Sequence, residues 1–517
     1  MSKLANYIQG QWQEGHGEGT PLFDPILGTE LARVSAHGLD LNAAYNWARS
    51  NAGPALRNLT YAQRAELLKK IAEVLQANRD KYYDISLQNS GTVKNDTAVD
   101  VDGSIYTLGY YARLGAKISG QHLQLDGEAD ALARDNVFAS QHIQVPSQGI
   151  ALFINAFNFP AWGLWEKASA ALLSGVPVVV KPATATAWLT HEMVKDVVEA
   201  DILPKGALNI ICGRPDGLLE ALQPLDLVSF TGSAETAATL RSHPKIRLEG
   251  VRLNAETDSI NSAILGPDAA ALDLLVREVV REMTSKSGQK CTAIRRIFVP
   301  ENHYDDVAKA IAERLKKIIV GDPRQEDVRM GSLVSLTQKK AIEDGINELE
   351  KIADVLYDGR SESTVKVDNP ESACVAPLLF GVKNPDTTEA IHSLEVFGPV
   401  ATLMPYRDAA HAYELARRGN GSLVASVYSE DAAFLADAAT QLAESHGRVL
   451  LINEAVAKAQ TGHGNAMPQC NHGGPGRAGG GQELGGLRAL QFYHRLAAIQ
   501  AAPEVLKHLA SAPADQA

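Results

Sequence analysis

The side chain best suited to nucleophilic chemistry is Cys291, in the stretch SGQKCTA at residues 287–293. A thiolate is the competent nucleophile, and it needs accessible surroundings that lower the pKa of the thiol. Lys290 and the local backbone amides are expected to favour the thiolate, and Gly288 allows tight backbone geometry near a ligand. A small buried hydrophobe is the alternative for any single cysteine, and it is what we expect for Cys212 on a predicted strand.

Several polar side chains follow predicted strands in the region from residue 149 to residue 232. Apolar strands alternate there with helices, which predicts parallel βαβ units. Ligands of such sheets bind beyond the carboxyl ends of the strands. Asn158, Lys181 and Thr231–Ser233 each come just past such an end, so we expect them to converge. The predicted elements are a helix opened by a Thr60–Gln63 capping box, strands at 149–155, 176–181, 208–212, 226–232, 295–300 and 447–453, and helices at 160–173, 189–200, 215–222 and 304–319.

The composition excludes several classes of protein. The chain has 517 residues, of which 45% are hydrophobic and 21% charged, and its formal net charge is −12. This is a globular mixture with room for about three domains. The acidic balance argues against nucleic acid as a partner. No apolar run reaches membrane-spanning length. Four cysteines in so long a chain are not a disulfide framework, and we expect a reducing cytoplasm.

Three other motifs carry less weight. The match of GPGRAG (474–479) to a dinucleotide fingerprint lacks the strand that should precede it. Ten of the thirty residues 461–490 are glycine, so we expect a flexible loop dominated by its backbone. SGQK matches one box of the serine acylases, but the other boxes are not evident. His463, Cys470 and His472 do not complete a coordination shell, so we expect solvated loop histidines and no metal.

Four stretches together change the interpretation: NAFNFPAW (155–162), SFTGS (229–233) with LNAE (253–256), SGQKCTA, and EVFGPV (395–400). With KPA, VGDP and GQELGG they resemble the NAD(P)-dependent aldehyde dehydrogenase superfamily over nearly the whole chain. Each motif alone is weak, but their shared order and spacing are highly specific. The resemblance implies an α/β fold with a Rossmann-like cofactor domain, an α/β catalytic domain and a small β oligomerisation arm.

The resemblance implies that Cys291 adds to an aldehyde and that the product leaves as a carboxylic acid. Asn158 matches the asparagine that points its amide at the substrate oxygen, where such a donor contributes about 3–4 kcal/mol. Glu256 matches the general base that activates water, and burial could raise its pKa. Glu483 stands where relatives can carry a proton-relay glutamate. A turn asparagine and a surface glutamate are the alternatives.

The resemblance also implies a nicotinamide cofactor. Lys181 matches the residue at the adenosine ribose or its 2′ substituent. Three positions later, many NAD-preferring relatives carry a glutamate, where this chain has Thr184. Loss of that carboxylate removes repulsion against a 2′-phosphate, so we expect NADP, with NAD as the alternative. The other implied cofactor residues are Ser233 at the helix start that receives the pyrophosphate, Glu395 at the nicotinamide ribose, Phe397 beside the nicotinamide, and Phe157.

Departures from the common motifs indicate a branch of the superfamily. Phe157 replaces the usual tryptophan, Thr257–Ile260 replaces the usual L-G-G-K, and Ala237 replaces a glycine. With HGGPGRAGGGQELGG (472–486), these changes resemble the branch attached to benzoate and other aromatic catabolism through CoA thioesters. The implied substrate is a CoA-linked aliphatic semialdehyde. The competing hypotheses are a CoA-acylating dehydrogenase, which typically lacks the base glutamate, a catalytically silent protein on this fold, and a cysteine hydrolase.

The expected domains follow from the same resemblance. An arm of strands leaves an open sheet edge that another subunit can cover, so we expect a homodimer, with a tetramer second. The expected ranges are 1–125 and 147–256 for the cofactor-binding domain, 257–460 for the catalytic domain, 126–146 and 487–500 for the oligomerisation arm, and 461–486 for a Gly-rich loop closing the site.

Overall fold

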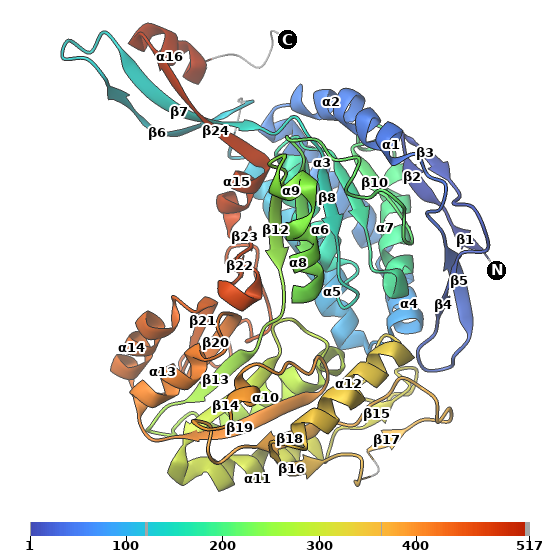
Figure 1. Cartoon of the computed structure of the whole chain (residues 1–517), viewed down its shortest axis with the longest axis vertical. Helices are drawn as coiled ribbons and strands as arrows, with labels where there is room; N and C mark the ends of the chain where they lie inside the picture. Colours follow the sequence, from blue (N-terminus) through green and yellow to red (C-terminus); the bar gives the residue numbers. More distant parts are fainter. Residues whose placement is uncertain (1, 119–121, 363, 512–517) are drawn as a thin grey trace.

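A computed structural model describes residues 2–118, 122–362 and 364–511. Two α/β lobes lie one above the other in Figure 1, and an arm of strands projects from the upper lobe. No helix in the described ranges is both long and apolar enough to cross a membrane. The expected domain ranges include residues 1, 119–121 and 363, which lie outside the described residues, and the division into domains stays a prediction.

The upper lobe is built on a seven-stranded sheet of order β12-β11-β8-β9-β10-β2-β3. Its first five strands are parallel and rich in buried Val, Leu and Ile, as strands covered on both faces must be. The bounds are β8 Ala151–Ile154, β9 Val178–Lys181, β10 Leu208–Ile210, β11 Leu227–Thr231, β12 Arg252–Glu256, β2 Asn6–Ile8 and β3 Gln11–Gln13; the main helices are α3 Tyr61–Ala77, α4 Arg79–Ser90, α5 Lys94–Gly115, α6 Trp162–Leu173, α7 Ala187–Glu199 and α8 Ala234–Ser242.

The lower lobe is built on a second seven-stranded sheet, of order β16-β18-β19-β14-β13-β20-β21. Successive residues of its strands face opposite sides: Phe298 packs in one apolar cluster, and Ile297 and Val299 pack in another. The bounds are β13 Asn261–Leu265, β14 Ile294–Pro300, β16 Asp354–Asp358, β18 Leu378–Gly381, β19 Val400–Tyr406, β20 Ser422–Tyr428 and β21 His446–Ile452, with helices α10 Leu272–Thr284, α11 Tyr304–Leu315, α12 Leu336–Leu349, α13 Ala409–Arg417 and α14 Ala432–Leu442.

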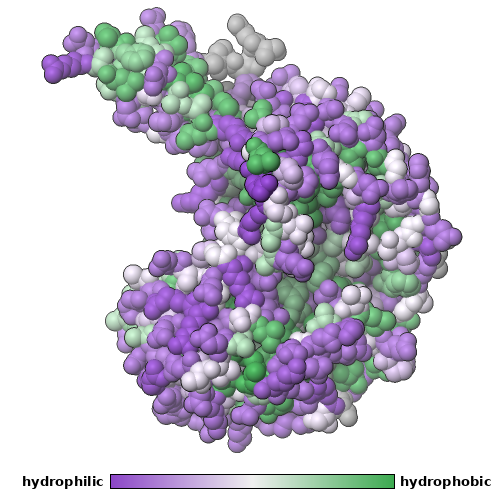
Figure 2. Space-filling view, viewed as in Figure 1, coloured by the Kyte–Doolittle hydropathy of each residue, from purple (hydrophilic) through white to green (hydrophobic). Residues whose placement is uncertain are grey.

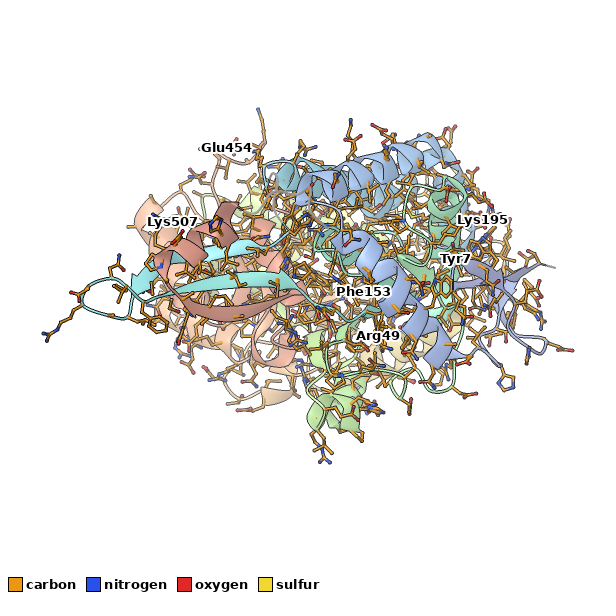
Figure 3. All side chains as sticks on the ribbon, turned by 90° about the horizontal axis from the view of Figure 1, so that it is seen from above. Tyr7, Arg49, Phe153, Lys195, Glu454 and Lys507 are labelled. Carbon is orange, nitrogen blue, oxygen red and sulfur yellow. The ribbon has the colours of Figure 1, made fainter. Side chains whose placement is uncertain are left out.

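The arm is a three-stranded antiparallel sheet of order β24-β7-β6. Its strands β6 (Gln124–Ala131), β7 (Ala139–Pro146) and β24 (His494–Ala501) extend beyond the body in two perpendicular views (Figures 1 and 3). The smaller elements are β1 Lys3–Leu4, β4 Thr20–Phe23, β5 Glu30–Val34, β15 Val320–Gly321, β17 Val365–Lys366, β22 Asn471–Gly473 and β23 Gln482–Leu484, with helices α1 Leu41–Trp47, α2 Gly53–Arg57, α9 Pro244–Arg247, α15 Leu490–Tyr493 and α16 Pro503–Ser511.

The predicted α/β class is confirmed by the two mainly parallel sheets. The capping box is also confirmed, because the Thr60 side chain accepts from the Gln63 amide and the Gln63 side chain accepts from the Thr60 amide. The helix predicted near 215–222 is wrong. That segment forms turns, in which Gly217 takes a left-handed φ of 71° that a right-handed helix does not contain.

Candidate active site

The carboxyl ends of the upper strands open into a cavity of about 250 Å³, which we call the strand-end cavity. Asn158 follows β8, Glu256 ends β12 and Ser233 precedes α8, and all three line it. The structure thus brings together side chains that are far apart in the sequence. The cavity is also lined by Phe157, Thr231, Asp258, Cys291, Glu395 and Phe397.

A second cavity of about 300 Å³, here named the aromatic cavity, lies on the other side of Cys291. It runs between α5 and the Gly-rich segment 461–486, and Cys291 is half-buried and lines both cavities. Two ligands entering from different sides can therefore meet at this sulfur. The aromatic cavity is lined by Tyr106, Phe159, Trp162, Met467 and His472, together with smaller residues of both segments.

The backbone before Cys291 is held in an unusual turn. Lys286 and Ser287 have φ values of 50° and 54°, and Gly288 has 69°. Left-handed geometry costs about 1–2 kcal/mol for each residue with a Cβ, so the turn needs support from its surroundings. Buried Asp96 provides it, because its Oδ2 accepts from the Lys286 amide at 2.8 Å. Backbone strain of this kind often accompanies functional sites.

Glycine is required at position 288 for a second reason. A Cβ there would lie 2.1 Å from the carbonyl oxygen of Gly398. The other side of Cys291 is fixed by Asn261, whose Nδ2 donates to the Cys291 carbonyl at 2.8 Å. The turn and this hydrogen bond fix the backbone on both sides of the sulfur.

The expectation that Lys290 favours the thiolate is wrong. Lys290 is buried, and its Nζ lies 2.8 Å from both carboxyl oxygens of Glu282. Burial and the neighbouring carboxylate of Glu256 raise the pKa of Cys291 well above its ordinary value. The resting side chain of Cys291 is therefore a thiol, and its ionisation needs a base.

Glu256 and Cys291 form a compact cluster with His472. One side-chain atom of each lies within 4.8 Å of the others, and His472 Nε2 is 3.1 Å from Glu256 Oε2. Burial alone would raise the pKa of Glu256, but neighbouring His472 and Lys167 outweigh burial and lower it to about 2. The predicted raised pKa of Glu256 is therefore wrong, because the sequence did not indicate these partners.

The interpretation of His463 and His472 as solvated loop residues is also wrong. They are 0% and 3% exposed. Within the Gly-rich segment, the short strands β22 and β23 pair into an antiparallel ribbon, and the rest of the segment is turns and loop. Its glycines permit close backbone contact, since a Cβ on Gly473 would lie 2.0 Å from the Gly481 carbonyl oxygen. Within the described ranges, the side chains of Glu256, Cys291 and His472 lie close enough together to hold a metal ion.

A buried ionic cluster lies behind Glu256. Lys167 Nζ lies 2.5 Å from Glu166 Oε1 and 3.2 Å from Glu483 Oε2. Ser229 Oγ donates to Glu483 Oε1 at 2.5 Å. Burial raises the pKa of Glu166 well above its ordinary value, although Lys167 opposes this. Sequence reasoning placed Glu483 here but missed Glu166 and Lys167, whose signal is two adjacent charges inside the otherwise apolar helix WGLWEKASAALL.

Lys181 ends β9, the strand next to β8, and Thr184 follows in the next turn; neither is among the residues that line the strand-end cavity. Burial and the nearby charge of Arg214 lower the pKa of Lys181. Sequence reasoning missed Arg214. Strands β9 and β10 are parallel neighbours, so a basic residue soon after β10 is expected to approach the end of β9. Two cations therefore lie together at this edge of the sheet.

The start of α8 is already partnered within the protein. Ser233 is the N-cap, and its side chain accepts from the Thr236 amide at 3.2 Å. The Ala234 amide donates to Asp258 Oδ1 at 2.9 Å. Asp258 stands where the common motif has a glycine, so a phosphate group at this helix start would take the place of its carboxylate.

The remaining side chains fit a nicotinamide nucleotide. Within the described part of the chain, the buried Oε1 of Glu395 has no hydrogen-bond partner, whereas Oε2 accepts from the Ser259 amide at 3.3 Å. Burial raises the pKa of Glu395 to about 7. A ribose hydroxyl can supply the missing partner. Phe157 and Phe397 pack edge to face with their ring centroids 5.9 Å apart, leaving an apolar wall for a flat ring.

Comparison with known proteins agrees with this geometry. Residues 12–499 match the aldehyde dehydrogenase family. The chain is 52% identical over 479 residues to a 3,4-dehydroadipyl-CoA semialdehyde dehydrogenase of Aromatoleum evansii, covering 92% of this chain and 93% of that protein. It is 25% identical to a D-glyceraldehyde dehydrogenase (NADP(+)) of Thermoplasma acidophilum, covering 84% and 86% of the two chains.

The fold is shared with solved structures. An NAD+ complex of an aldehyde dehydrogenase from Bacillus cereus superposes with a TM-score of 0.83 at 23% identity and covers 97% of both chains. The match over nearly the whole sequence, together with Cys291 between two cavities, leads to one conclusion. The chain belongs to the aldehyde dehydrogenase family and is an NAD(P)-dependent enzyme that oxidises an aldehyde.

Proposed function

We propose that this enzyme oxidises a CoA-linked aliphatic semialdehyde, such as 3,4-dehydroadipyl-CoA semialdehyde, to the free carboxylic acid with NADP. The observation that carries the proposal is the position of Cys291, which borders both the aromatic cavity and the strand-end cavity. The aromatic cavity is the entrance for the aldehyde, and the strand-end cavity receives the cofactor. The substrate class rests on the relative from Aromatoleum evansii.

In the first half of the reaction, the sulfur of Cys291 adds to the aldehyde carbon while Glu256 takes the thiol proton. Asn158 supplies a neutral donor for the resulting oxyanion. It is 5% exposed, and its amide forms no hydrogen bond within residues 2–118, 122–362 and 364–511, so it is available to the substrate. When bound, the nicotinamide supplies the hydride acceptor. The acyl group then remains on Cys291 as a thioester.

Before the second half, Glu256 passes the thiol proton to the buried cluster behind it. As a carboxylate again, it takes a proton from a water molecule that hydrolyses the thioester, which releases the acid and frees the sulfur of Cys291. The proton then leaves through the buried cluster of Lys167, Glu166 and Glu483, which lies behind Glu256. A general base beside the thioester supports hydrolysis over transfer of the acyl group to CoA. The enzyme is therefore hydrolytic and releases the acid.

The preference for NADP is supported by two cations and one neutral residue. Lys181 and Arg214 lie near each other, and Thr184 contributes a hydroxyl group but no repelling carboxylate. A 2′-phosphate carries the charge that such a group recognises. NAD lacks this phosphate and therefore gains less binding energy from the two cations.

The roles of the two lobes and the arm, and the cellular compartment, are part of the same proposal. The upper lobe is the cofactor-binding domain, the lower lobe is the catalytic domain, and segment 461–486 closes the site between them. The arm joins two subunits into a homodimer, or four into a tetramer. Four free cysteines, of which Cys212 and Cys374 are buried, support a reducing cytoplasm.

A turnover assay tests the proposed reaction. The enzyme is given 3,4-dehydroadipyl-CoA semialdehyde or a linear aldehyde, with NADP or NAD and without free CoA. We expect reduced cofactor and free acid in equal amounts, and the highest kcat/KM for the CoA-linked substrate with NADP. A strict requirement for added CoA would overturn hydrolysis, and equal kcat/KM for the two substrates would overturn the substrate class.

A further inference from the structure

We propose that His472 is a positioning residue that holds the carboxylate of Glu256 beside Cys291 in the state that accepts the thiol proton. The inference rests on the proposed roles of Cys291 and Glu256. It assigns a task to a buried histidine that the mechanism above leaves unused.

The ribbon β22–β23 explains how His472 reaches the base. His472 pairs directly with Glu483 across its two antiparallel strands. Residues opposite each other in an antiparallel pair point to the same face. On one face of the ribbon, His472 therefore contacts Glu256, and Glu483 contacts Lys167. The same short element supplies both groups to the buried cluster.

Glu256 is the polar contact that the structure gives to the His472 side chain. The ring is 3% exposed, and its Nε2 lies 3.1 Å from Glu256 Oε2. In the described part of the chain Nε2 has no well-aligned hydrogen bond to any group, so its approach to Glu256 is a close polar contact. Trp162 packs edge to face on the imidazole, with ring centroids 5.3 Å apart at 65°. An imidazole held by one aromatic ring and facing one carboxylate is placed to orient that carboxylate.

Acidic groups outnumber basic ones around Glu256. Glu256 is faced by Lys167 and Glu166 from α6, by Glu483 from β23 and by Cys291. The cluster thus has three carboxyl groups and one lysine, and the imidazole of His472 is the further ring-nitrogen group that reaches Glu256. Glu395 lines the strand-end cavity, and Asp102 lines the aromatic cavity with its Oδ1 2.6 Å from Arg79 Nε. His472 is also a main reason for the depressed pKa of Glu256.

The contact between His472 and Glu256 matters because these two residues line different cavities on either side of Cys291. His472 lines the aromatic cavity and Glu256 lines the strand-end cavity, whereas Cys291 lines both. The contact between His472 and Glu256 therefore spans the sulfur and holds the carboxylate close to the thiol. Without His472, burial and the neighbouring carboxylates would favour the neutral acid, which cannot accept a proton.

The test uses two substitutions with different chemistry, assayed in the full-length enzyme with a linear aldehyde and NADP. His472→Phe keeps a ring of similar size but removes the polar contact, whereas His472→Gln keeps a donor that does not titrate. We expect His472→Phe to slow the first-turnover burst of reduced cofactor by about 100-fold, the usual contribution of a placed acid or base. We expect His472→Gln to keep a clearly larger part of the burst rate, and both to keep the KM for NADP.

The pH profile separates positioning from packing. The acid limb of kcat/KM reports the ionisation of Glu256, and loss of His472 raises that pKa, so the limb should move to higher pH. His463→Gln is the matched control, because His463 is fully buried in the same segment, contacts Ser426 Oγ at 2.7 Å and lines neither cavity. We expect the acid limb of kcat/KM to stay at the same pH in His463→Gln.

Two results would overturn the inference. One is an unchanged burst rate and acid limb in His472→Phe. The other is a slower burst with an unmoved limb in both His472 variants, which would assign His472 to packing alone. If His472→Phe fails to fold, the acid limb of His472→Gln decides. Because a linear aldehyde is the substrate, failure of the CoA-linked substrate class would leave this test intact.

Discussion

At the residue scale, the carboxylate of Glu256 opposes ionisation of Cys291. Burial and Glu256 raise the pKa of the thiol, whereas His472 and Lys167 lower the pKa of the carboxyl group against the effect of burial. The resting pair is therefore a thiol next to a carboxylate. Proton transfer must accompany attack on the aldehyde, and the ionised sulfur does not accumulate beforehand.

This coupling makes a prediction about thiol reactivity. Glu256→Gln removes a negative charge next to Cys291, so the pKa of the thiol falls and more thiolate is present at pH 8. We expect alkylation of Cys291 by iodoacetamide to become about tenfold faster for each unit by which the pKa falls. Peptide mapping separates Cys291 from the exposed Cys470. A rate unchanged from the unsubstituted enzyme would contradict the coupling.

Arg214 makes a second prediction at this scale. Arg214→Ser removes the exposed cation near Lys181 but leaves the cavity walls intact. We expect the KM for NADP to rise about tenfold, as a lost charge-assisted hydrogen bond of about 1.5 kcal/mol implies, and the KM for NAD to change little. Steady-state rates with both cofactors measure this. Equal effects on NADP and NAD would remove Arg214 from the recognition of the 2′-phosphate.

At the element scale, the turn before Cys291 is tightly constrained by its neighbours. Three successive residues with positive φ precede the loop that carries the nucleophile, and Asp96 holds the first of them. Gly288 passes so close to the Gly398 carbonyl that a side chain has no room. The position of the sulfur therefore depends on contacts with distant segments.

A pair of glycine substitutions tests this constraint. Gly288 and Gly250 have φ values of 69° and 76°, but a Cβ at Gly250 would meet nothing within 4 Å. We expect Gly250→Ala to lower the free energy of unfolding by about 1–2 kcal/mol, the cost of the conformation. Gly288→Ala should cost about 1–3 kcal/mol more through overpacking, and should also abolish the burst. Denaturant unfolding measures both, and equal losses would contradict the clash.

The sequence predicted the elements better than it predicted the electrostatics. Strand ends at Asn158 and Lys181 followed from hydrophobic runs, because local patterns specify strands. The pKa of Glu256 could not be predicted in the same way, since His472 approaches it from another strand late in the chain. The turns at 215–222 were misread as a helix because the apolar pattern does not reveal the left-handed φ of Gly217. The ribbon β22–β23 was missed because glycine signals flexibility in sequence but permits close packing in a fold.

At the scale of the whole molecule, the arm carries apolar side chains that a single chain leaves exposed. Apolar side chains gather on it in Figure 2, where the arm extends from the body. A patch of this kind commonly marks a contact between proteins. Its exposed large hydrophobic residues include Leu125, Leu132, Val137, Phe138, Leu496 and Val505.

The arm therefore predicts the oligomeric state. Leu496 on β24 is 61% exposed in the single chain, so Leu496→Asp places a charge on the surface without disturbing a core. We expect the unsubstituted enzyme to be a dimer or tetramer, and the variant to shift towards monomer with its fold retained. Light scattering after gel filtration measures the mass. A monomeric unsubstituted enzyme would contradict the role of the arm.

The most direct test of the central claim is mass spectrometry of the Glu256→Gln enzyme, quenched with acid after one turnover with aldehyde and NADP. The account predicts a slowed first turnover, because the amide cannot take the thiol proton, and then a stalled thioester: one acyl group on the peptide that carries Cys291, in equal amount to the reduced cofactor. Reduced cofactor and free acid released at the unsubstituted rate, or an acyl group carried by another residue, would contradict the account.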